Sequence, residues 1–117
     1  MLIKSQDRLP QASPHGPRIR KEVLLANGVA PAVTQVAVST IEPWDNIETH
    51  QHPTMWEFFF VLSGNATYML DDEEFYVQSG DLFVVPPGRP HKQMVHDSPH
   101  IVLHWGVAAD SDSIGGI

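Results

Sequence analysis

The sequence predicts an all-β fold, a sandwich or barrel of short strands. Runs rich in Val, Ile, Thr and Phe alternate with turn signals such as Asn-Gly, Ser-Gly and Pro-Gly, which recur about every 8–12 residues. No stretch shows the sustained apolar period of a helix. With 117 residues, of which 42% are hydrophobic, the chain is long enough for one domain with one core.

Three segments are expected along the chain. Residues 1–18 should form an irregular N-terminal arm, because three prolines deny them a helix. Residues 19–108 should form the folded domain. Residues 109–117, which are small and polar, should form a flexible C-terminal tail.

Each strand of the domain is expected where an apolar or β-branched run lies between turn-forming residues. The first run ends at Asn27-Gly28, and a charged turn of Asp and Glu separates two of the central runs. In chain order, the expected strands lie within residues 19–29, 32–41, 47–52, 58–62, 66–70, 75–78, 82–85, 91–95 and 101–107.

The composition argues against several classes of partner. The formal net charge is −7 with only seven Lys and Arg, so a nucleic-acid partner is not expected. No apolar run approaches the length of a membrane span, and the first residues lack the apolar core of a signal peptide. The absence of cysteine excludes disulfides and thiolate zinc sites. We therefore expect a soluble, cytoplasmic protein.

The segment THQHPTMWEFFFVLSG, residues 49–64, places polar side chains beside a strongly apolar run. His50 and His52 stand two apart, so on a strand they share one face, and Glu57 could return to that face after the Pro53 corner. His91 follows a proline-glycine turn further along. A single histidine of this kind is usually a surface or hydrogen-bonded residue, but together they could form a metal site.

Two motifs in these segments resemble those of the cupin family. The first cupin motif runs from a glycine through a His-x-His pair and a glutamate to a second glycine, and here His50-Gln51-His52, four residues, Glu57, six residues and Gly64 match it. The second motif runs from a glycine through Pro-x-Gly to a histidine and then an asparagine. Gly80, five residues, Pro86-Pro87-Gly88, two residues and His91 match this second motif.

Two positions depart from the cupin pattern. Trp44 stands where the first motif opens with glycine, and Val95 stands where the second closes with asparagine. We expect Asp45 and Asn46 to form the turn without the glycine. Neither departure falls on a metal ligand.

The resemblance implies a double-stranded β-helix, a small jelly roll whose two sheets enclose a metal inside one end. It implies His50, His52, Glu57 and His91 as the metal ligands. Imidazole and carboxylate ligands suit one divalent transition metal per chain: Fe, Mn, Ni, Zn or Cu. Such a set leaves coordination positions open for water or a small molecule.

Further residues are candidates for the pocket wall. Counting alternate residues from the ligands places Phe59 and Gln93 on the pocket face. Tyr68 and His104 could line the pocket as well, although both could be core residues. Gln93 and His104 are the candidate catalytic groups. Gln93 could orient a ligand or a bound water, and His104 could act as an acid or base because an imidazole with an ordinary pKa near 6.5 suits that chemistry. Arg89 could meet an anion at the mouth, but a surface arginine is the simpler interpretation.

The function expected first is that of a metal-dependent enzyme acting on a small organic molecule. Fe(II) dioxygenation is the first choice of reaction, and an O₂-independent isomerase or lyase reaction is the second. A non-catalytic ligand-binding or sensor cupin is the alternative. A metal with a purely structural role is a weaker alternative, since structural metal sites are commonly closed and cysteine-rich.

A homodimer is also expected. Phe58 and Phe60 should point outward from a strand whose other face is buried, and a strand that is apolar on both faces needs covering on both. The cupin resemblance implies the same, because small cupins often form dimers in which the sheets of two copies pack against each other.

Overall fold

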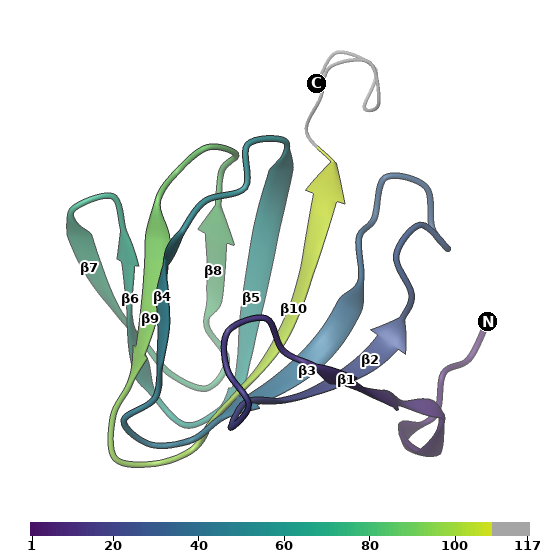
Figure 1. Ribbon diagram of the computed structural model, residues 1–117, viewed down its shortest axis with the longest axis horizontal. Helices are drawn as coiled ribbons and strands as arrows, with labels where there is room; N and C mark the ends of the chain where they lie inside the picture. Colours follow the sequence, from purple (N-terminus) through teal and green to yellow (C-terminus); the bar gives the residue numbers. More distant parts are fainter. Residues whose placement is uncertain (109–117) are drawn as a thin grey trace.

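The computed structural model of the chain describes residues 1–108, and the expected tail at residues 109–117 lies outside them (Figure 1). Within the described residues, ten strands form two antiparallel sheets, and a short 3₁₀ turn, η1 (Ser5–Asp7), is the one helical segment. No helix of this part of the chain is long and apolar enough to cross a membrane. The expected all-β double-stranded β-helix is confirmed.

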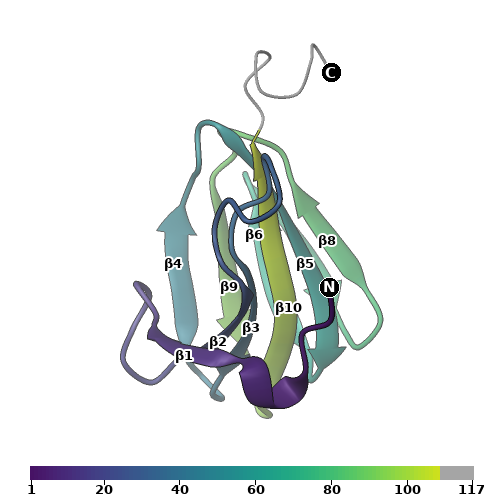
Figure 2. The ribbon, with the colours of Figure 1, turned by 90° about the vertical axis from the view of Figure 1, so that its right-hand side faces the viewer.

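The two sheets lean against each other and enclose the interior of the molecule (Figures 1 and 2). The larger sheet has the order β1 (Leu9–Ala12), β2 (Arg20–Leu25), β3 (Val36–Ile41), β10 (His100–Ala108), β5 (Met55–Ser63) and β8 (Leu82–Val85). The smaller sheet has the order β4 (Asn46–His50), β9 (His91–Val95), β6 (Ala66–Leu70) and β7 (Glu73–Val77).

The core draws on the inward face of both sheets. Because side chains alternate along a strand, β5 buries Phe59 and Val61 while Phe58 and Phe60 remain only partly covered. Val95 is buried in the same core, so the position of the motif asparagine serves packing here. The largest fully buried side chains within residues 1–108 are Tyr68, Ile41, His100, Val61, Val85, Val95 and Val102.

The N-terminal arm is more ordered than expected. Within residues 1–18, β1 pairs antiparallel with β2, from Leu9 opposite Val23 to Ala12 opposite Arg20. The physical reason is that the outer edge of β2 carries backbone groups that need partners, and an edge strand tolerates Pro10. All four residues of β1 are exposed, so no apolar alternation could reveal it.

The turn before β4 also differs from expectation. Trp44 itself adopts the left-handed conformation, with φ of 66°, and Asp45 and Asn46 do not take it over. The Trp44 N–H points at the carbonyls of Val95 (3.2 Å) and His96 (3.0 Å). These backbone contacts hold Trp44 beside the end of β9 in a conformation that glycine adopts more readily.

Candidate metal centre

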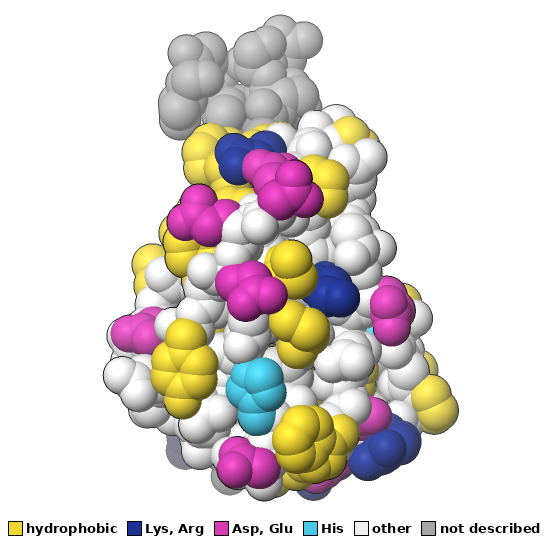
Figure 3. Space-filling model, turned by 90° about the vertical axis from the view of Figure 1, so that its left-hand side faces the viewer, with side chains coloured by type: hydrophobic (Ala, Val, Ile, Leu, Met, Phe, Trp, Pro, Cys, Tyr) yellow, Lys and Arg dark blue, Asp and Glu magenta, His cyan; other side chains and the backbone are white. Residues whose placement is uncertain are grey.

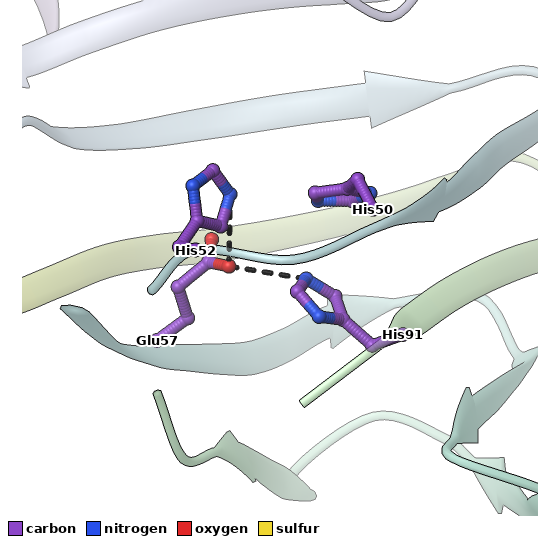
Figure 4. A group of neighbouring side chains, drawn as sticks. All are labelled: His50, His52, Glu57 and His91. Carbon is purple, nitrogen blue, oxygen red and sulfur yellow. Dashed lines mark ion pairs between the residues drawn. The ribbon is translucent and has the colours of Figure 1, made fainter. Parts of the chain in front are cut away.

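Four side chains far apart in the sequence converge on one point (Figure 4). His50 ends β4, His52 follows it in the loop, Glu57 lies on β5, and His91 begins β9. One nitrogen or oxygen of each lies within 4.8 Å of the others. These are the four residues that the cupin resemblance implied as ligands.

Backbone pairing brings the two motifs together. His50 and His91 are opposite each other in the β4–β9 ladder. The Gly88 N–H donates to the carbonyl of His52 (2.9 Å), and Gly88 has a φ of 75°, which favours glycine. The proline-glycine turn is thus tied directly to the loop that carries His52.

Backbone carbonyls orient two of the imidazoles. His50 Nδ1 lies 2.8 Å from the carbonyl of Glu48, and His91 Nδ1 lies 3.0 Å from the carbonyl of Arg89. Because a carbonyl oxygen only accepts, Nδ1 must carry the proton in both rings. The lone pair of each neutral ring is then on Nε2, the arrangement that metal-ligating histidines adopt.

Within the part of the chain that the structure describes, the glutamate oxygen at the centre lacks a well-directed partner. Glu57 Oε1 lies 3.2 Å from His52 Nε2 and 3.1 Å from His91 Nε2. The His91 pair is close enough for an ion pair, yet both of its atoms are buried and neither meets hydrogen-bond geometry. Buried polar atoms without partners are costly, so a cation between them would satisfy all three side chains.

The spacing suits a first-row metal. Two ligand atoms on opposite sides of such an ion, each about 2.1 Å from it, are about 4.2 Å apart. The observed limit of 4.8 Å requires closure by a few tenths of an ångström. The described residues therefore fit a metal held by three imidazoles and one carboxylate.

The electrostatics of the cluster favour an ionised glutamate. Burial alone would raise the pKa of Glu57, but the contact with His91 and the neighbouring imidazoles hold that pKa below its usual value. Burial alone would lower the pKa of His91, but the contacts with Glu57 and the Arg89 carbonyl raise it. The carboxylate is thus ready to ligate at neutral pH.

A cavity of about 430 Å³ opens beside this cluster. His50, His52 and Glu57 line it, whereas His91 is nearly fully buried. The volume lies within the usual range for small-molecule sites. The centre therefore faces a space large enough for an organic ligand.

Three of the four expected wall residues reach this cavity. Phe59, Gln93 and His104 line it. Tyr68 is not among the lining residues. It is 1% exposed in the core, and its hydroxyl lies 2.5 Å from His100 Nε2.

His104 is a neutral residue of the cavity wall. Burial first, and then the charge of Lys21, lower its pKa to about 4. Its Nε2 lies 2.7 Å from the hydroxyl oxygen of Ser39. The ordinary pKa on which the acid–base expectation relied is therefore not the pKa of this imidazole, which carries no charge near pH 7.

Two further titratable residues line the cavity and were not expected from the sequence. His15, from the N-terminal arm, has its ring centroid 4.7 Å from that of His50. Nothing in the sequence of the arm indicates this contact. Lys21 on β2 also lines the cavity. The sequence pattern could have indicated this, because Lys21 is two residues from both Ile19 and Val23, which are buried on the same face.

Arg89 lies away from this arrangement. Its guanidinium pairs with Asp71 through Nε (2.6 Å) and through a terminal nitrogen, and it is exposed. It does not line the cavity. The simpler interpretation, a surface arginine, describes it.

Comparison with known proteins agrees with the geometry. A family model described as "Cupin domain" matches residues 37–105, the part that contains all four clustered residues. An uncharacterised protein of Methanocaldococcus jannaschii is 34% identical over 94 residues, which is 78% of this chain and 74% of the relative.

Solved structures show the same fold at low sequence identity. A predicted oxalate decarboxylase of Thermotoga maritima has a TM-score of 0.82 and 15% identity, over 92% of this chain and 99% of the other. KdgF of a Halomonas species has a TM-score of 0.79 and 17% identity, over 96% and 98%. An RmlC-like cupin of Shewanella frigidimarina has a TM-score of 0.75 and 16% identity, over 93% and 91%.

Proposed function

Since this chain belongs to the cupin family, we propose that it binds one divalent transition metal and acts as a metal-dependent enzyme on a small organic molecule. The proposed ligands are His50, His52, Glu57 and His91. One observation carries the proposal: the convergent ligand atoms, with a buried unpartnered pair among them, border a cavity of about 430 Å³.

The protein residues have defined tasks in this proposal. The carbonyls that hold His50 and His91 fix the ligand lone pairs before any metal arrives, which limits reorganisation. Phe59 and Gln93 shape the adjoining wall and position the substrate. A bound metal would supply Lewis-acid or redox chemistry at the mouth of this cavity.

Oxygenase-type chemistry with Fe(II) is the leading form of the proposal. Apart from the proposed ligands and Lys21, the titratable groups on the described cavity wall are His15 and His104, and burial lowers the pKa of both, so the metal would have to supply most of the reactivity. The same observation favours the second candidate, a cupin that binds a small ligand without turnover. An O₂-independent isomerase or lyase would have to use the Ser39–His104 pair for proton transfer.

Metal analysis joined to oxygen uptake tests the proposal. Protein purified without an affinity metal should contain about one transition metal per chain. Oxygen consumption with a panel of small acids and diketones should identify a substrate if the oxygenase form is right. Metal binding without turnover of any kind would favour the sensor. Failure to hold Fe, Mn, Ni, Zn or Cu would overturn the proposal.

A substitution in the centre separates a catalytic metal from a structural one. We expect His91→Ala to abolish metal binding and any turnover while leaving a folded β-protein, because a core of this size does not depend on a cation as a zinc finger does. The measurement is thermal unfolding by circular dichroism, with and without EDTA. His96→Ala is the control, because His96 contacts Thr67 (2.8 Å) outside the cluster and its variant should keep the metal.

The opposite result is equally clear. If EDTA or His91→Ala removes the cooperative unfolding transition, the metal holds the barrel together and its catalytic assignment is wrong. The freed polar atoms would then be buried and unpaired.

A further inference from the structure

Lys21 is an ammonium group on the wall of the metal-bordered cavity. It lies on the inward face of β2 between the buried Ile19 and Val23. No ion pair or hydrogen bond of its side chain is formed within residues 1–108. The acidic residue next to it in the sequence, Glu22, pairs instead with Arg8 (3.8 Å).

The surroundings of Lys21 are neutral hydrogen-bonding groups. Lys21 and Ser39 are opposite each other in the β2–β3 ladder, and Ser39 contacts His104. Lys21, His15 and His104 line the same cavity, and the charge of Lys21 contributes to the lowered pKa of both histidines. Partial burial lowers the pKa of Lys21 itself, as expected for a cation that gives up some of its water without gaining an anion from residues 1–108.

The cavity is also positively charged as a whole once a metal is bound. A divalent ion next to ionised Glu57 leaves one net positive charge, and Lys21 adds a second. This lies inside a chain whose formal net charge is −7. Such a local reversal of sign selects anionic molecules and attracts them to the cavity.

We propose that Lys21, with the Ser39–His104 pair beside it, binds a carboxylate group of the substrate while the other end of the substrate lies at the metal. This inference rests on the proposed function and names its substrate class: small organic acids with a metal-binding head and a separate carboxylate. A single ammonium with neutral donors suits one carboxylate.

The separation of the two sites favours a short substrate. In the larger sheet, β3 and β10 lie between β2, which carries Lys21, and β5, which carries Glu57. Three strand spacings amount to about 14 Å between backbones, and two long inward side chains shorten that gap. A chain of a few carbons would connect the two ends within about 430 Å³.

The test compares matched ligands on the metal-loaded protein. The probes are oxaloacetate, 2-oxoglutarate and 2-oxoadipate, each against the 2-oxo acid of equal length that ends in methyl. Calorimetry should show at least one dicarboxylate binding about tenfold or more tightly than its methyl partner, as expected for a hydrogen bond to a charged group. Lys21→Met should remove that preference and leave the methyl series unchanged.

A matched control and a metal assay keep the outcomes apart. Arg20→Met removes a cation from the neighbouring, exposed position of β2 and should keep the preference. Equal binding of both series by metal-loaded wild type, or a preference that survives Lys21→Met, would overturn this inference alone. A wild-type protein without metal would overturn the proposed function and this inference together. Thermal melts should show Lys21→Met folded, because it removes an unpaired charge.

Discussion

Trp44 occupies a backbone position that favours glycine. Its φ of 66° is strained for a bulky side chain, and its ring is 71% exposed, with an edge-on approach to His96 (centroids 6.4 Å apart). The left-handed conformation costs a residue with a Cβ about 1–2 kcal/mol. The chain therefore keeps a large exposed ring at a position where it weakens the fold.

Two substitutions at Trp44 separate strain from ring contact. We expect Trp44→Gly to be more stable than Trp44→Ala by about 1 kcal/mol, because both lose the ring but only glycine relieves the strain. Urea denaturation of the two variants and the wild type measures the difference. Equal stability of the Gly and Ala variants would show that the turn relaxes without strain.

His104 makes stability depend on pH. Its pKa is about 4 in the fold, below its usual 6.5, so the folded state resists protonation. Its contribution is complete above about pH 6.5 and is lost as the pH falls from there towards about 4, by at most on the order of 3 kcal/mol. Burial also lowers the pKa of His100 to about 4, so His100 changes the stability in the same direction as the pH falls.

His104→Gln isolates one of these two contributions. We expect the free energy of unfolding of this variant to fall less steeply than that of the wild type between about pH 6.5 and 4, because one titrating group is gone. Chemical denaturation with EDTA present at each pH gives both curves, so that metal release does not contribute. Parallel curves would contradict the assignment.

At the scale of elements, the β5–β6 turn tolerates only glycine. Gly64 has a φ of 73°, and a Cβ there would clash with the carbonyl of Pro99. Gly80, in the turn before β8, has a φ of 93° but open space around it. A residue with a Cβ would therefore be strained at both positions, but only at position 64 would its Cβ also clash with a neighbouring backbone.

Alanine at these two glycines should have unequal effects. We expect Gly64→Ala to lower the free energy of unfolding by about 3 kcal/mol or more, since strain and a backbone clash add. Gly80→Ala should cost about 1 kcal/mol, from strain alone. Denaturant titration measures both. Similar costs would mean that the Pro99 segment moves aside easily.

At the scale of the whole molecule, the outer face of the six-stranded sheet is the surface we propose for a homodimer. Phe58 stacks on Trp105 there (centroids 5.3 Å apart, planes at 9°), and Leu62 and Leu82 are exposed. By contrast, hydrophobic and charged side chains are interspersed over the opposite end of the molecule (Figure 3). Residues 1–30 continue the same sheet through β1 and β2, so they should contribute to the contact.

Charge introduced on this face should prevent dimerisation. We expect sedimentation at micromolar concentration to show a dimer for the wild type and a monomer for Leu62→Glu/Leu82→Glu, because stable interfaces of this kind bury about 2,000 Å² or more and exclude unpaired charge. Tyr76→Glu, on β7 of the other sheet, is the control and should remain dimeric. A wild type that sediments only as a monomer would refute the proposal.

Much of the fold was predictable because its signals are local. Turn residues between β-branched runs located the strands from β2 to β10, and the spacing of two short motifs indicated the four clustered side chains. The strand β1 could not be read in this way, since its residues are exposed and its formation depends on the free edge of β2.

The sequence by itself therefore determined the strand pattern, the cupin motifs and the identity of the candidate ligands, because each depends on residue type and short spacing. The tertiary structure decided what surrounds those ligands. It brought His15 from the arm to His50, lowered the pKa of His104 by burial, and placed Lys21 in the cavity without a partner among residues 1–108. These outcomes depend on which strands meet across a sheet and how far each side chain is removed from water. Local sequence does not encode such distances.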